Sequence, residues 1–159
     1  MIQINISLEM LDRARTKASS LGSLRNSITN GDGNLIGFLG EEIAHSVLGG
    51  YINNSYDYDI VLDDGMTVDV KTKKTSVPPK DHYECSVAAF NTKQQCDMYC
   101  FVRVKSDLSC GWFLGTYNKE AYYKDAVLLK KGDVDLSNNF IVKANCYNMK
   151  ISDLNGEYL

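Results

Sequence analysis

Hydrophobic residues recur at helical spacing in two segments of the first third of the chain. In residues 7–21 they stand at positions 8, 11, 14 and 18, directly after Ser7, a residue type that caps helices. In residues 34–48 they stand at positions 35, 39, 43 and 47, between a capping Asn34 and two glycines. The pattern therefore predicts two helices joined by a loop at 23–34.

β-branched and aromatic runs with two-residue alternation dominate the chain after these helices. Two such runs, at 56–62 and 66–73, flank Asp63-Asp64-Gly65, which is a hairpin signal. Short helices are predicted after two further asparagine caps, from Asn91 to Cys96 and from Asn118 over 119–126. Additional strands are predicted at 82–90, 98–104, 111–117, 138–144 and 146–154. The fold class expected from this order is α/β with a mixed central sheet flanked by helices, plus C-terminal strands.

The hairpin places several charged side chains on one face of the sheet. With a three-residue loop at 63–65, Leu62 faces Met66 and Asp59 lies across from Asp69; a two-residue turn at Asp64-Gly65 would shift this register by one. Alternation then separates the side chains of the hairpin into two sets. One face carries Asp59, Asp69, Lys71 and Lys73, and the other carries Ile60, Leu62, Val68 and Val70.

Two carboxylates opposed across strands repel each other, so stability alone disfavours Asp59 opposite Asp69. A divalent cation removes this objection, because Mg²⁺ binds carboxylate oxygens at about 2.0–2.1 Å and keeps several waters. Lys71 would stand beside that ion, where its ammonium can position an attacking water or stabilise charge on a phosphate. The alternative is two solvated acids paired with Lys71 and Lys73 on an exposed face.

The helix over 34–48 offers a third carboxylate, Glu41. Glycine or alanine at positions 37, 40 and 44 lies on or near its helical face, so the backbone there can approach a sheet closely. Glu42 is expected to face solvent, although periodicity alone permits the reverse assignment. Arg13 and Lys17 belong to a basic stripe on the first helix, which is interpreted as ordinary helix surface.

Glu41, Asp59 and the triplet Asp69-Val70-Lys71, on this order of elements, resemble the PD-(D/E)xK nuclease superfamily. The resemblance covers about residues 34–105, through "GFLGEEIA", "YDYDIVL" and "TVDVKT", with tyrosine in place of the proline in the family's name. It implies the restriction-endonuclease-like fold, with an αβββαβ core, in a single nuclease-like domain over 1–159. Beyond residue 106 the chain matches only small phage-type nucleases, and only vaguely.

The resemblance also implies an activity and a set of site residues. The activity is Mg²⁺-dependent hydrolysis of DNA phosphodiester bonds by an endonuclease, with Mn²⁺ able to substitute. Glu41, Asp59, Asp69 and the Val70 carbonyl would surround the metal, and Lys71 would take the catalytic role. The family often adds a polar residue from the next helix, a place that Gln94 or Gln95 could fill. Apart from the resemblance, Lys73 and Lys74 are candidates for contact with DNA phosphates, and the alternative is a solvated strand edge.

Composition limits the partners of such an enzyme. The chain has 159 residues, 44% of them hydrophobic, and a net charge of −3, so it lacks the global basic field of an architectural DNA-binding protein. Contact with DNA must therefore be local, or be supported by a homodimer or a protein partner that delivers the substrate. A catalytically inactive module of the same fold, which binds nucleic acid or a protein, is the alternative.

The five cysteines form no CxxC pair, so we expect buried free thiols in a reducing compartment rather than a zinc site. The first residues lack the pattern of a signal peptide, and no run approaches the length of a membrane span. The expected location is the cytoplasm.

Overall fold

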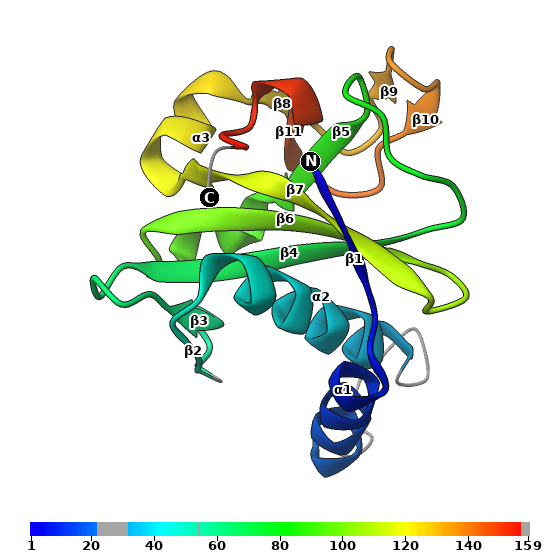
Figure 1. Cartoon of the computed structure of the whole chain (residues 1–159). Coiled ribbons are helices and arrows are strands. Elements are labelled where there is room, and N and C mark those ends of the chain that lie inside the picture. Colours follow the sequence, from blue (N-terminus) through cyan, green and yellow to red (C-terminus); the bar gives the residue numbers. More distant parts are fainter. Residues whose placement is uncertain (22–31, 54, 157–159) are drawn as a thin grey trace.

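The computed structural model describes residues 1–21, 32–53 and 55–156, so most of the predicted loop at 23–34 lies outside the described residues (Figure 1). The chain is mixed α/β, as predicted. Within the described ranges, none of the helices combines the length and apolar character that crossing a membrane requires.

A mixed sheet of six strands forms the centre of the described structure, in the order β1-β7-β6-β4-β3-β2. Its strands are β1 (Ile2–Asn5), β2 (Tyr51–Ile52), β3 (Ile60–Val61), β4 (Thr67–Thr75), β6 (Met98–Lys105) and β7 (Cys110–Asn118). β4 and β6 run parallel, and every other neighbouring pair is antiparallel. The chain must therefore cross from one end of the sheet to the other between β4 and β6.

The remaining elements lie on the two faces of this sheet (Figure 1). Helices α1 (Leu8–Ser20) and α2 (Asp32–Leu48) cover one face, where α2 contacts β4, β6 and β7. The other face carries α3 (Lys119–Asp125) and a three-stranded sheet in the order β5-β11-β8. These strands are β5 (Glu84–Ala88), β8 (Val127–Leu129) and β11 (Cys146–Lys150), and a hairpin of β9 (Val134–Asp135) and β10 (Phe140–Ile141) lies beside them.

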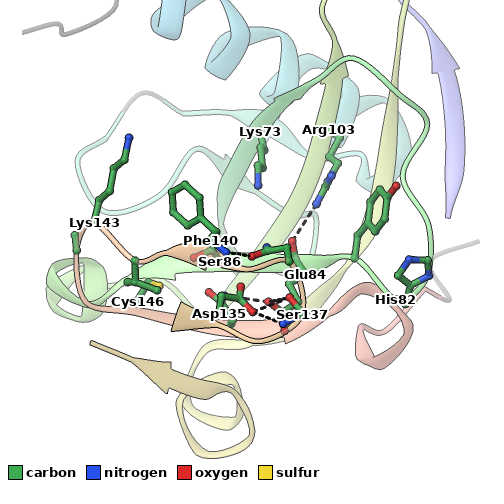
Figure 2. Close-up of a pocket in the computed structure, with 15 residues that line it drawn as sticks. Lys73, His82, Glu84, Ser86, Arg103, Asp135, Ser137, Phe140, Lys143 and Cys146 are labelled. Atoms are coloured by element: carbon green, nitrogen blue, oxygen red, sulfur yellow. Dashed lines mark hydrogen bonds between the residues drawn. The ribbon is translucent and has the colours of Figure 1, made fainter. Parts of the chain in front are cut away.

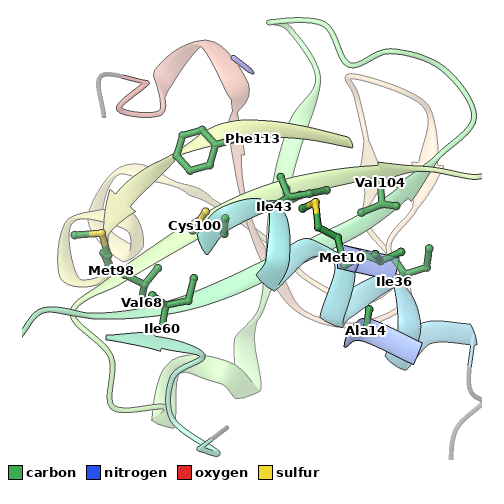
Figure 3. Packing of buried hydrophobic residues seen from close by; sticks show 13 residues of the cluster. Met10, Ala14, Ile36, Ile43, Ile60, Val68, Met98, Cys100, Val104 and Phe113 are labelled. Carbon is green, nitrogen blue, oxygen red and sulfur yellow. The ribbon is translucent and has the colours of Figure 1, made fainter. Parts of the chain in front are cut away.

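Each face of the central sheet carries one buried cluster, and strand β6 contributes side chains to both. The aliphatic cluster, on the side of α1 and α2, takes Met98, Cys100, Val102 and Val104 from this strand (Figure 3). The aromatic cluster, on the opposite side, takes Tyr99 and Phe101 from β6 and is completed by residues that include Trp112, Leu114, Tyr122 and Met149. β6 thus lies at the centre of the molecule and is buried along almost its whole length.

The predicted caps at Ser7 and Asn118 and the hairpin turn are confirmed, whereas Asn34 lies inside α2, which begins at Asp32. Ser7 caps α1 by accepting from Met10 N, and Asn118 caps α3 by accepting from Ala121 N. The hairpin has the predicted register, since Ile60 pairs with Val68 and Leu62 N donates to Met66 O at 2.9 Å. The predicted three-residue loop at 63–65 is therefore confirmed.

Several strand or helix predictions are wrong in extent or partner. The predicted strands at 56–62 and 138–144 shorten to β3 and β10, of two residues each. The segment 82–90 contributes only β5, which pairs with β11 outside the central sheet, because β6 already occupies that edge of β4. The helical turn after it is a 3₁₀ helix, η1 (Ala89–Lys93), that contains Asn91 instead of beginning there. Residues 146–154 split into β11 and a second 3₁₀ helix, η2 (Ile151–Asp153).

All five cysteines are free thiols, as expected. Cys85, Cys100 and Cys110 are buried, whereas Cys96 and Cys146 are only half-buried, so the prediction of five buried thiols is wrong for these two. Burial raises the pKa of Cys85 and of Cys96 to about 12.

Candidate active site

Strand β4 presents a row of charged side chains, Asp69, Lys71 and Lys73, on the face opposite to α2. Val68 and Val70, which alternate with them, pack against the aliphatic cluster. On the neighbouring strand β6, the register partners of the three charged residues are, in the same order, Tyr99, Phe101 and Arg103. The charged row therefore runs along the edge of the aromatic cluster, from a carboxylate to a group of cations.

Asp69 and Lys71 form the closest ion pair of this row. Lys71 Nζ lies 2.6 Å from Asp69 Oδ2, and the Asp69 side chain is buried. Asp69 Oδ2 nevertheless accepts no hydrogen bond of good geometry in the described structure, so the contact depends on charge alone. A buried carboxylate oxygen without a directed donor can still accept a further cation.

Gln94 holds the other side of the Lys71 ammonium. Lys71 Nζ donates to Gln94 Oε1 at 3.0 Å, and Gln94 Nε2 donates to Tyr56 O at 3.1 Å. The Tyr99 ring lies below the same ammonium, 5.6 Å from Nζ to the centroid. These contacts fix the position of the lysine that was predicted to be catalytic.

Asp59 reaches the site from the point where β3 begins. Its backbone N donates to Val68 O at 2.9 Å, and its Oδ2 accepts from Val70 N at 2.7 Å. The predicted arrangement, with Asp59 and Asp69 side by side on one face, is therefore corrected: β3 is only two residues long, and the Asp59 side chain takes the place of a further strand bond. Burial, with the nearby charges of Glu41 and Asp69, raises the pKa of Asp59 to about 7.

Glu41 comes from α2, which lies directly on β4 at this point. A Cβ on Gly40 would overlap the Thr72 side chain, so this contact requires glycine. Glu41 is 7% exposed and forms an ion pair with Lys17 of α1. Burial raises the pKa of Glu41, and the charges of Glu42 and Asp69 add to this effect, whereas Lys17 opposes it.

Glu42 is buried rather than solvent-facing, so that expectation is wrong. It is 8% exposed and pairs with Arg13 of α1 at 2.7 Å. The helix has two covered sides, one toward the sheet and one toward α1, and Glu42 lies on the second. Glu41 is accordingly the residue of this pair that interacts with Asp59 and Asp69.

Arg13 and Lys17 are more than ordinary helix surface. They stand four residues apart on one face of α1 and pair with the adjacent acids of α2. The sequence does show two bases at helical spacing on α1 and two adjacent acids on α2. These patterns do not show that the bases pair with the acids.

Of the four remaining candidate residues, two lie at the site and two lie away from it. Gln94 joins the site, whereas the Gln95 side chain donates to Lys93 O and its backbone N donates to Asp57 Oδ1. Lys73 continues the charged row. Lys74, next on the strand, points to the opposite face by alternation and is exposed.

The carboxylates of this site fit a metal ion in their chemistry but not in their present arrangement. As the side chains stand, no group of three or more His, Cys, Asp or Glu residues in the described part of the chain is arranged to hold one. Lys17 and Lys71 instead pair with Glu41 and Asp69. Carboxylate oxygens are nevertheless the ligands that a hard cation prefers, and the buried Asp69 Oδ2 accepts no hydrogen bond in the described structure.

Comparison of the chain with models of protein families and with curated proteins finds no match.

Proposed function

We propose that this chain is a Mg²⁺-dependent nuclease that hydrolyses DNA phosphodiester bonds, and that it acts as an endonuclease. One observation carries the proposal: Lys71 Nζ lies 2.6 Å from the buried Asp69 carboxylate, and burial together with the charge of nearby carboxylates, Asp69 among them, raises the pKa of Glu41 and of Asp59. Such a concentration of negative charge is costly unless a cation completes it.

The fold is compatible with a restriction-endonuclease-like core. A helix that carries Glu41 precedes three antiparallel strands, and the next strand of the sheet, β6, runs parallel to β4. Two details depart from the expected αβββαβ order. Its second helix would correspond to the single 3₁₀ turn η1, and the crossover to β6 also contributes β5 to another sheet.

Glu41, Asp59 and Asp69, with the Val70 carbonyl, would hold the metal. A bound Mg²⁺ supplies a Lewis acid for a phosphate oxygen and lowers the pKa of a coordinated water. Lys71 then orients the attacking water and stabilises the charge that develops on the phosphate. Gln94 keeps the Lys71 ammonium in place through the 3.0 Å hydrogen bond. Hydrolysis breaks a P–O bond of the backbone, with the oxygen of water forming the new bond to phosphorus.

The substrate must be held by local charge, since the net charge of the chain is −3. Lys73 extends the charged row beyond Lys71, and Arg103 stands beside it on β6. A homodimer or a protein that delivers DNA would add further contacts. The five free thiols suit a reducing compartment such as the cytoplasm.

A second candidate function is a catalytically inactive module of the same fold that binds nucleic acid or a protein partner. The ion pairs of Lys17 with Glu41 and Lys71 with Asp69 favour it, because they neutralise two of the carboxylates without a metal.

Cleavage assays distinguish the two functions. Supercoiled plasmid and single-stranded DNA are incubated with the protein in Mg²⁺, Mn²⁺ or EDTA, and products are resolved on gels. We expect metal-dependent cleavage that is lost in Asp69→Asn and retained in Lys74→Met, a charge change on the opposite face of β4. If the wild type is inert in both metals while still binding DNA, the inactive module is the correct description.

A further inference from the structure

A cavity of about 640 Å³ lies next to the charged row, between strands β4 and β6 and the β5-β11 sheet (Figure 2). Lys73 and Arg103 line it from the central sheet, while Glu84 and Phe140 line it from the opposite side. A smaller hollow shares Lys73, Glu84 and Arg103 with it and is also lined by Lys71. The cavity therefore lies next to a hollow that the proposed catalytic lysine lines, rather than remote from it.

Two cations lie side by side on the wall of this cavity. Lys73 and Arg103 are register partners, and Lys73 is two residues beyond Lys71, which corresponds to about 7 Å along a strand. Lys73 forms no ion pair or hydrogen bond with the described residues. Its ammonium is available for an anion next to the one that Lys71 would contact.

Arg103 has unused hydrogen-bonding capacity although it is only 7% exposed. Its Nη2 donates to Glu84 O at 3.0 Å, and no other donor of its guanidinium has an acceptor in the part of the chain that the structure describes. The guanidinium packs over the Tyr83 ring, 5.3 Å from Cζ to the centroid. A fixed, shielded guanidinium with free donors facing a cavity is suited to a phosphate group.

The opposite side of the cavity offers hydrogen-bond acceptors and an aromatic ring. Ser137 Oγ lies 2.7 Å from Asp135 Oδ1 and 3.2 Å from Glu84 Oε2, so its one O–H can donate to either of two neighbouring carboxyl groups. Carboxyl oxygens of this kind accept hydrogen bonds from the exocyclic amino groups of bases. Phe140 is 51% exposed at the cavity, and Lys143 Nζ lies over its ring, 5.8 Å from the centroid. An exposed ring of this kind can stack on a base.

We infer that this cavity binds one unstacked nucleotide of the DNA strand, next to the phosphate that is cleaved. Lys73 and Arg103 would hold its phosphate, Phe140 would stack on the base, and Glu84 with Asp135 would accept from its polar edge. The inference rests on the proposed nuclease function and adds the substrate class. A base inside a duplex must unpair and unstack before it can enter this cavity, which is unfavourable. Single-stranded or locally unpaired DNA is therefore the preferred substrate.

Binding measured without metal tests this inference separately from catalysis. Single-stranded and duplex oligonucleotides that contain 2-aminopurine, whose fluorescence reports unstacking, are titrated with the protein in EDTA. We expect single strands to bind at least tenfold more tightly than duplex, with a fluorescence change that excess deoxynucleoside monophosphate reverses. Phe140→Ala and Lys73→Met should each weaken binding about tenfold, as loss of one stacked base or one phosphate contact does.

Each variant has a matched control on the same element. Ile141→Ala changes the exposed neighbour of Phe140 outside the cavity, and Lys74→Met removes a charge from the other face of β4; both should bind within twofold of wild type. Equal affinity for duplex and single strand, or unchanged binding by Phe140→Ala, would overturn the inference. If Mg²⁺-dependent cleavage persists in that case, the nuclease proposal stands without the pocket. If binding depends on Phe140 but no metal supports cleavage, the pocket stands and the catalytic proposal fails.

Discussion

Lys71 Nζ lies 2.6 Å from Asp69 Oδ2, although both side chains come from one strand and are separated by a single residue. The contact is possible because β4 directs both side chains to the same face. It places a carboxylate and an ammonium at one point of the proposed active site.

Replacement of either member of this pair should remove activity without unfolding the protein. Lys71→Met takes away the charge that would stabilise the phosphate, and we expect a loss of about 10²–10³-fold in cleavage rate. Plasmid nicking measures the rate, and circular dichroism checks the fold. Lys74→Met is the control and should cleave within threefold of wild type; equal activity of Lys71→Met would remove this lysine from the mechanism.

Glu41 and Glu42 are adjacent and equally buried, so their substitution separates a metal ligand from a structural acid. Glu41→Gln should weaken Mn²⁺ binding more than tenfold in calorimetric titrations, because one charged ligand is lost. Glu42→Gln should leave Mn²⁺ affinity unchanged and lower the free energy of unfolding by about 1 kcal/mol, through its weaker contact with the exposed Arg13. The opposite result would assign the metal to Glu42.

Asp59 should make the metal-free protein less stable at alkaline pH. Its pKa is about 7 in the folded chain and 3.8 ordinarily, so its contribution is complete below pH 4 and is lost as pH rises through 7. Between pH 5 and pH 8 the loss is on the order of 3 kcal/mol, since pH 5 lies two units below the folded pKa and one pKa unit corresponds to about 1.4 kcal/mol. Urea unfolding in EDTA at pH 5 and pH 8 measures it.

Asp59→Asn supplies the comparison for that measurement. Its side-chain oxygen can still accept from Val70 N, and it carries no charge, so this variant should be more stable than wild type at pH 8 and nearly equal at pH 5. Asp63→Asn, in the exposed loop of the same hairpin, should behave like wild type at both pH values. Identical pH dependence in wild type and Asp59→Asn would show that another group is responsible.

Alanine substitutions at two glycines of α2 should have opposite effects on the stability of the protein. Gly40→Ala overlaps Thr72 and should destabilise the protein by about 1–3 kcal/mol despite the better helix propensity of alanine. Gly37 has no atom within 4 Å of an added Cβ, so Gly37→Ala should stabilise by about 0.5–1 kcal/mol. Thermal denaturation measures both. Adding Thr72→Ala to Gly40→Ala should recover part of the loss, and no recovery would place the strain elsewhere.

The parts of the fold that depend on neighbouring residues could be predicted from the sequence. The hairpin register follows from the length of its loop, where Gly65 takes a φ of 86° that favours glycine. The caps at Ser7 and Asn118 depend on residues only three positions away. Placement of Asp69 and Lys71 on one face required only the two-residue period of a strand.

Features that depend on distant partners could not be predicted in the same way. β5 has an alternating pattern that suits any sheet, and its partner β11 lies about 60 residues later in the chain. Glu42 is covered by a helix whose approach to α2 no periodicity specifies. The edge strand β1 was missed although Ile2, Ile4 and Ile6 alternate with polar residues, a pattern typical of a strand with one covered face.

The alternation of β6 between the two clusters has a consequence for changes in chain length. Deleting or inserting one residue in Met98–Lys105 would exchange the two sets of side chains, so that Tyr99 and Phe101 would enter the space of Cys100 and Val102. Neither cluster could absorb such an exchange at native packing density. Insertions should therefore be rejected within the strand and accepted after it, at the exposed Ser106 and Asp107, which makes this position suitable for a fluorescent label or an epitope.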